Sequence, residues 1–85
     1  MVLREIRVLD NKGLRAALAS LMVKKAMSYD SEITIEYNGK KANAKSFINV
    51  LALNVPQGAV VALSAEGRDE TLAAEGIEGF FNLSN

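Results

Sequence analysis

The Asn38-Gly39 pair most constrains the fold of this chain. It lies between residues 32–37, in which β-branched and aromatic residues alternate with polar ones, and residues 40–43. A type I′ turn needs positive φ at both central residues, which Asn and Gly adopt readily, and such a turn joins two antiparallel strands directly. The sequence therefore predicts a β-hairpin over residues 32–43.

Two further segments have the pattern of β-strands. Apolar and charged residues alternate over residues 2–9, which predicts a strand that directs Ile6 and Val8 towards the core. Residues 59–65 form a nearly continuous apolar run, which predicts a well-covered strand.

Three segments favour helices. Residues 16 to about 28 are mostly good helix formers and predict one amphipathic helix. Residues 47–51 predict a short helix with Ser46 as its N-cap. A last helix begins after Gly67, where Asp69 or a neighbour can cap it. The residues that give the first and last helices their spacing are Leu18, Leu21, Met22, Lys25 and Ala26, and Ala73, Ile77, Phe80 and Phe81. We expect the last helix to fray, because Gly76 and Gly79 cost about 1 kcal/mol each relative to Ala.

The predicted elements follow the order βαββαβα. With 85 residues the chain has room for one domain, residues 1–85, in which the helices must cover one face of a small sheet. Asp10-Asn11-Lys12-Gly13 is a turn cluster between the first strand and the first helix. The sequence therefore predicts an α+β open-faced sandwich.

The sequence contains no histidine and no cysteine. Disulfides, Cys/His zinc sites, thiol nucleophiles, imidazole catalysis and phosphohistidine chemistry are therefore excluded. No pair of carboxylates is marked out by spacing and an apolar setting, so we expect neither an enzyme nor a metal or cofactor site. No apolar run approaches the length of a membrane span, and charges interrupt the first residues, so we expect a cytoplasmic protein without membrane contact.

Charge is unevenly distributed along a chain whose net charge is zero. Residues 1–45 hold nine basic and five acidic residues, whereas residues 46–85 hold one basic and five acidic residues. The basic half forms either ordinary solvated faces or a patch for an acidic protein partner. Nucleic acid is the weakest of the candidate partners, because aromatic platforms and an overall basic charge are missing.

Two segments resemble a known family. They are Ile35-Glu36-Tyr37-Asn38-Gly39-Lys40-Lys41-Ala42-Asn43-Ala44-Lys45-Ser46 and Leu63-Ser64-Ala65-Glu66-Gly67-Arg68-Asp69-Glu70, the latter preceded by Gly58. They resemble the hairpin and serine-site segment, and the fourth strand and last helix start, of HPr, the histidine-containing phosphocarrier of the bacterial sugar phosphotransferase system. The resemblance runs without gaps over nearly the whole chain. It implies a four-stranded antiparallel sheet with three helices on one face.

The active-centre loop departs from the family pattern. The family has Gly, an aliphatic residue, His, Ala, Arg, Pro and Ala there, and this chain has Gly13-Leu14-Arg15-Ala16-Ala17-Leu18-Ala19. Arg15 thus stands at the position of the phospho-accepting histidine. A guanidinium has five donors and no acceptor, so Arg15 cannot accept a phosphoryl group, although it can contact a phosphate. The alternative is a solvated basic side chain in a loop.

Ser46 matches the family's second site. In one branch an HPr kinase phosphorylates this serine, and the product docks on a transcription regulator in catabolite repression. A phosphate there would add nearly two negative charges beside the free amides of a helix N-terminus, which is favourable. The alternative is that Ser46 is only an N-cap. Asn49 and Asn54 replace residues that are commonly Gly in the family, and Ala17 replaces the arginine that would lie near the phosphate.

The resemblance also implies a partner-binding surface. Family members use an apolar patch on the second helix together with basic residues of the first, and here the candidates are Arg15, Lys24, Phe47, Ile48 and Leu51. We expect Phe47 to be exposed with Lys24 nearby. The alternative is that these apolar residues are core, which we expect of at least one of Ile48 and Leu51.

These features support a histidine-less HPr-like regulatory or binding protein that is no histidyl phosphocarrier and that phosphorylation at Ser46 can switch. Its candidate partners are an HPr kinase and a transcription regulator. One alternative is a decoy that binds Enzyme I or sugar-specific transporter domains without phosphoryl transfer. Another is an HPr-like structural subunit. We expect a monomer or a weak homodimer, and residues 10–13 could act as a hinge for swapping the first strand.

Overall fold

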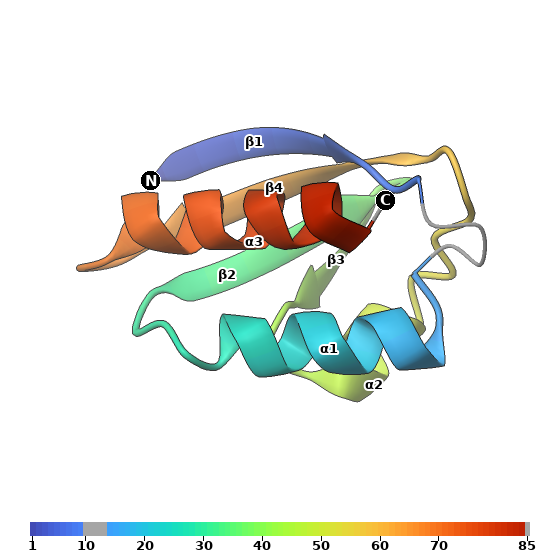
Figure 1. Ribbon diagram of the computed structural model, residues 1–85, viewed down its shortest axis with the longest axis horizontal. Coiled ribbons are helices and arrows are strands. Elements are labelled where there is room, and N and C mark those ends of the chain that lie inside the picture. The colour runs from blue at the N-terminus through green and yellow to red at the C-terminus, as the bar shows by residue number, and fades with distance from the viewer. Residues whose placement is uncertain (10–13, 85) are drawn as a thin grey trace.

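The computed structural model describes residues 1–9 and 14–84. Its elements are β1 (Val2–Arg7), α1 (Ala16–Ala26), β2 (Glu32–Tyr37), β3 (Lys40–Asn43), α2 (Phe47–Leu51), β4 (Val60–Glu66) and α3 (Glu70–Ser84). The strands form one antiparallel sheet in the order β1-β4-β2-β3. All three helices lie on one face of this sheet, with α1 between α3 and α2 (Figure 1). The predicted order and fold class are confirmed. The turn predicted at residues 10–13 lies outside the described residues.

The predicted hairpin is present. Asn38 and Gly39 both have positive φ, 54° and 79°, as a type I′ turn requires. The turn places Tyr37 opposite Lys40, and the pairing continues to Thr34 opposite Asn43. The local turn chemistry therefore fixes the register of β2 against β3.

Strand β4 is covered on one face only, and the predicted well-covered strand is wrong in this respect. Val61, Leu63 and Ala65 are fully buried beneath the helices, whereas Val60 and Ala62 are exposed on the opposite face. The apolar run indicated burial on both sides, but no element packs on the second face within the described residues. Although β4 is a central strand, two of its five apolar residues therefore face solvent.

The first strand and first helix are both shorter than predicted. Strand β1 ends at Arg7, but Val8 remains buried because its amide and carbonyl bond to Ala59 and Gly58. Helix α1 ends at Ala26, and Leu21, which we expected on its apolar face, is 57% exposed. Leu21 lies outside the buried stripe of α1, which consists of Leu18, Ala19, Met22, Val23 and Ala26.

Helix α3 continues through both of its glycines to Ser84, and the expected fraying stays a prediction. Gly76 lies against the hydroxyl of Tyr29, where a Cβ atom would overlap the tyrosine. Ala73, Ala74, Ile77 and Phe81 are fully buried in the common core. Tertiary packing therefore outweighs the low helix propensity of the glycines.

Candidate functional site

Arg15 lies at the N-cap of α1 and its side chain is exposed. The backbone before it is fixed, because Leu14 is buried and its amide donates to the carbonyl of Val55 at 2.8 Å. The carbonyl of Arg15 accepts the first helical bond from Ala19, while its side chain makes no capping bond. The protein thus presents a guanidinium, which has only donors, at the start of α1.

Ser46 is the N-cap of α2, as predicted from the sequence. Its Oγ accepts a hydrogen bond from the Asn49 amide at 3.4 Å, and its side chain is half-buried. The far end of α2 leads to Asn54, whose φ of 54° is in the left-handed region. Asn tolerates this conformation better than most residues do, which explains how it can stand where the family commonly has Gly.

Lys45 joins the start of α2 to the end of α1. Its Nζ donates to the backbone carbonyl of Tyr29 at 2.7 Å, just beyond the C-cap residue Met27. Lys25 Nζ lies 5.8 Å from the centre of the Tyr29 ring. The Lys45 side chain therefore reaches the C-terminal end of α1, whereas Arg15 lies at the N-terminal end of the same helix.

The exposed sides of α1 and α2 carry large apolar residues. Ile48 is 70% exposed, Met27 65% and Leu21 57%, and Lys24 is exposed on the same helix as Leu21. Because α1 and α2 pack against each other, these side chains lie on neighbouring elements. We call Leu21, Lys24, Met27 and Ile48 the α1–α2 surface.

Two expectations about α2 are wrong. Phe47 is half-buried and packs against the core, although we expected it to be exposed. Neither Ile48 nor Leu51 is a core residue, because Ile48 is exposed and Leu51 is half-buried. Val50 is the residue of α2 that enters the core completely. In a helix of five residues only one side chain can point directly inward, and the preceding turn sets which one.

The α1–α2 surface is positively charged. The sequence of α1 and α2 has no acidic residue, and α1 ends in Lys24 and Lys25. Lys24 and Ile48 were predicted from the sequence as binding residues, whereas Leu21 and Met27 were not. Leu21 has helical spacing to the core residues, so its exposure is visible only once the rotation of α1 is known.

A separate cluster holds the loop before β2 against the start of α3. The Asp69 carboxylate accepts hydrogen bonds from the backbone amides of Asp30 and Ser31 at 2.9 Å each and from the Ser31 hydroxyl. The hydroxyl and the amides lower the pKa of Asp69 below its ordinary value because they stabilise the carboxylate. Gly67 approaches Ser31 so closely that a Cβ atom would overlap it. These contacts satisfy one another, so we assign them to the fold.

Within residues 1–9 and 14–84, no group of three or more acidic side chains is placed to hold a metal ion. In the same part of the chain, no helix has the length and hydropathy needed to cross a bilayer.

Residues 2–82 match the family described as the PTS HPr component phosphorylation site, in which PTS denotes the phosphotransferase system. This chain belongs to the HPr family. A crystal structure of HPr-C-His from Thermoanaerobacter tengcongensis is 38% identical, with a TM-score of 0.96 over 99% of this chain and 94% of that one. The phosphocarrier protein HPr of Bacillus anthracis is 32% identical, with a TM-score of 0.90 over 93% and 94%.

A third HPr-family relative is Crh, the catabolite repression protein of Bacillus subtilis. It is 36% identical, with a TM-score of 0.78 over 98% of this chain and 95% of Crh, and its crystal structure is described as a swapped, intertwined dimer. HPr-family members thus include phosphocarriers and a protein of catabolite repression.

Proposed function

We propose that this HPr-family protein is a regulatory binding protein of the sugar phosphotransferase system and carries no phosphoryl group at the start of α1. The observation that carries the proposal is Arg15, exposed at the N-cap of α1, on a helix whose surface also keeps large exposed apolar residues. The chemistry for phosphoryl acceptance is missing, while the chemistry for protein binding is present. We place this role in the cytoplasm and assign no enzymatic activity.

The loss of transfer follows from the side chains available. A phosphoryl acceptor must offer a lone pair to phosphorus, and the guanidinium of Arg15 has none to offer near neutral pH. Ala17 and Leu18 accompany this change, and Leu18 is buried in the core. Arg15→His alone would therefore restore the imidazole and leave the rest of the loop altered.

The side chains of the α1–α2 surface indicate which kind of protein partner can bind there. Leu21, Met27 and Ile48 supply apolar area, and Lys24 supplies positive charge without an acidic neighbour on α1 or α2. Such a surface fits a protein partner whose contact area is apolar and acidic. An HPr kinase and a transcription regulator of catabolite repression are the candidates.

Phosphorylation of Ser46 is the proposed switch. Its Oγ makes one long hydrogen bond, and the serine lies at the end of the α1–α2 surface where Lys45 joins the two helices. The test is incubation with an HPr kinase and ATP, followed by intact-mass measurement of wild type and Ser46→Ala. We expect one phosphoryl group on wild type and none on the variant. Wild type without an adduct, or an adduct that persists in Ser46→Ala, would refute the switch.

The second candidate function is a decoy that binds Enzyme I or sugar-specific transporter domains and blocks phosphoryl flow. The same surface favours it, because docking does not require an acceptor. Labelled Enzyme I titrated with a functional HPr and increasing amounts of this protein tests the decoy. Competition that Ile48→Glu abolishes supports it, and absence of competition at saturating protein eliminates it.

The fold also suits an interaction subunit, and the swapped dimer described for Crh makes exchange of β1 a proposal for this chain. The hinge for that exchange, residues 10–13, lies outside the described residues. Light scattering on a sizing column measures the mass of the particle directly, and a fixed dimer that does not dissociate on dilution is the expected result for a swapped strand.

A further inference from the structure

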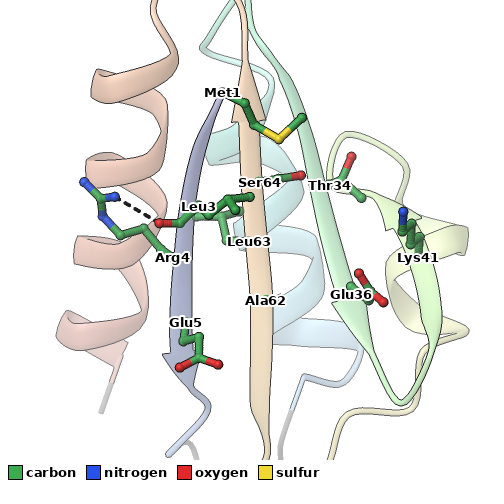
Figure 2. Close-up of a pocket in the computed structure, with 10 residues that line it drawn as sticks. All are labelled: Met1, Leu3, Arg4, Glu5, Thr34, Glu36, Lys41, Ala62, Leu63 and Ser64. Atoms are coloured by element: carbon green, nitrogen blue, oxygen red, sulfur yellow. Dashed lines mark hydrogen bonds between the residues drawn. The ribbon is translucent and has the colours of Figure 1, made fainter.

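The face of the sheet opposite the helices is uncovered. Leu3, from the edge strand β1, is 66% exposed and Val60, from β4, is 42% exposed, and Ala62 between them in the sheet is also exposed. Figure 2 shows this face from outside, with Leu3, Glu5, Thr34, Glu36 and Ser64 projecting from three strands. We call it the open sheet face.

A hollow of about 570 Å³ lies in the open sheet face. Its floor consists of small side chains on the central strands β4 and β2, namely Ala62, Ser64 and Thr34. Longer side chains rise on either side, Leu3 on β1 and Glu36 on β2 (Figure 2). The register explains the hollow, because Ala62 pairs with Glu5 on one side and with Glu36 on the other.

The open sheet face has an excess of negative charge. Its strands carry four carboxylates, Glu5, Glu32, Glu36 and Glu66, against two side-chain cations, Arg7 and Lys41. Two more cations line the hollow, Arg4 and the Met1 ammonium, and they form ion pairs with Glu78 and Glu70 of α3. Arg7 already donates to the carbonyl of Gly58 at 2.9 Å, and Lys41 stands directly opposite Glu36 in the register. Glu5 stands opposite Ala62 on β4, so it has no charged residue as its direct cross-strand neighbour there.

The two surfaces of this protein are complementary. The α1–α2 surface is basic with protruding apolar side chains, and the open sheet face is acidic with exposed apolar side chains around a hollow. We propose that the open sheet face binds the α1–α2 surface of a second copy of this chain. Ile48 or Leu21 of one copy enters the hollow beside Leu3 and Ala62, and Lys24 approaches the carboxylates of Glu5 and Glu36.

This inference rests on the docking role proposed for the α1–α2 surface, and it adds a regulation of that role. The contact joins different faces of two identical chains, so it adds copies one after another, either in an open row or in a closed ring. Every copy except the one at the end then has its α1–α2 surface occupied. Self-association at high concentration would therefore compete with partner binding.

Two variants test the contact, and each alters only one of the two faces that form it. The sheet-face variant is Glu5→Lys/Glu36→Lys, and the helix-face variant is Lys24→Glu/Ile48→Glu; all four side chains lie at the surface. Matched controls reverse charges elsewhere on the surface, with Glu75→Lys on α3 and Lys40→Glu beside the hairpin turn. Circular dichroism and a thermal melt verify that each variant is folded.

Sedimentation velocity over a wide concentration range is the measurement. We expect wild type and both controls to form a concentration-dependent series of species that added salt weakens. We expect each face variant alone to associate at least about tenfold more weakly, because its altered face repels the partner face. An equimolar mixture of the two variants keeps one intact helix face and one intact sheet face, so association should return in the mixture, with the 1:1 heterodimer as its first species.

Three results would overturn the inference: monomeric wild type at every concentration, association that ignores all four substitutions, and a mixture that stays monomeric. A swapped dimer gives the second result, because strand exchange does not use these faces. A failure of the proposed function can be told apart from a failure of this self-association. Phosphorylation of Ser46 and competition for Enzyme I are measured on dilute protein, and the sheet-face variant should behave as wild type in both.

Discussion

Gly76 and Gly79 occupy the same helix and have different surroundings. A Cβ atom at Gly76 would overlap the hydroxyl of Tyr29, whereas one at Gly79 would meet no atom within 4 Å. We expect Gly76→Ala to lower the free energy of unfolding by about 1–3 kcal/mol through overpacking. We expect Gly79→Ala to raise it by about 0.5–1 kcal/mol through helix propensity. Urea unfolding of both variants measures the difference, and equal signs would contradict the packing of Tyr29 beneath α3.

Asp69 should make the stability of the fold depend on pH in the acid range. Its pKa is lowered in the folded protein by the Ser31 hydroxyl and the backbone amides, so its contribution is present above the ordinary carboxyl pKa. That contribution is lost as the pH falls through the lowered value, that is, below about pH 4. Thermal melts between neutral pH and acid should show a smaller loss of Tm for Asp69→Asn than for wild type.

Asp30 provides the matched control for Asp69. It forms an ion pair with Arg68 at 2.9 Å, but both side chains are largely exposed, so the pair should contribute little. We expect Asp30→Asn to retain the acid dependence of wild type. If Asp30→Asn lost less Tm in acid than wild type while Asp69→Asn behaved as wild type, the acid dependence would come from Asp30 and the prediction for Asp69 would be wrong.

The sequence predicts residue-level features when they depend on near neighbours. Asn38-Gly39 and the Ser46 cap involve residues within a few positions of each other, and both are confirmed. The contact of Asp69 with Ser31 joins residues 38 positions apart, so no local sequence pattern predicts it. The role of Gly76 also depends on a distant residue. The sequence suggests only that this glycine weakens α3, because it does not show that Tyr29 packs against it.

At the scale of one element, α2 separates binding from stability. Ile48 is exposed and Val50 is fully buried on the same short helix. We expect Ile48→Ala to change the free energy of unfolding by less than about 0.5 kcal/mol and to weaken binding to an HPr kinase at least about tenfold. We expect Val50→Ala to cost about 2 kcal/mol of stability by leaving a cavity.

Binding titrations and urea unfolding of these two variants give the comparison. If Ile48→Ala bound the kinase as tightly as wild type, then α2 would have no part in docking. The folded fraction of Val50→Ala should still bind, because its exposed side chains are unchanged.

The sequence predicts the type of every element but not which faces they cover. Periodicity identified the strands and helices of the described residues, because alternation and helical spacing are local. The uncovered face of β4 and the exposure of Leu21 depend on where the helices pack, and the sequence contains no signal for that. The α1–α2 surface was therefore only half predictable, through Lys24 and Ile48.

At the scale of the whole molecule, folding rearranges the charges that the sequence divides into halves. Glu5 and Glu36 belong to the basic half of the sequence and yet contribute to the acidic open sheet face. Lys24 lies on the opposite side of the molecule, on a helix without acidic residues. The acidic open sheet face and the basic α1–α2 surface therefore lie on opposite sides of the sheet, and the charge counts along the chain locate neither of them.

The central claim is that this HPr-family protein keeps a docking surface and has lost phosphoryl acceptance. The most direct test is incubation with Enzyme I and phosphoenolpyruvate, followed by intact-mass measurement under conditions that preserve acid-labile phosphate, with a functional HPr in the same tube as the positive control. We predict a full phosphoryl adduct on that HPr and an unchanged mass for this protein. A phosphoryl adduct on this protein would contradict the account.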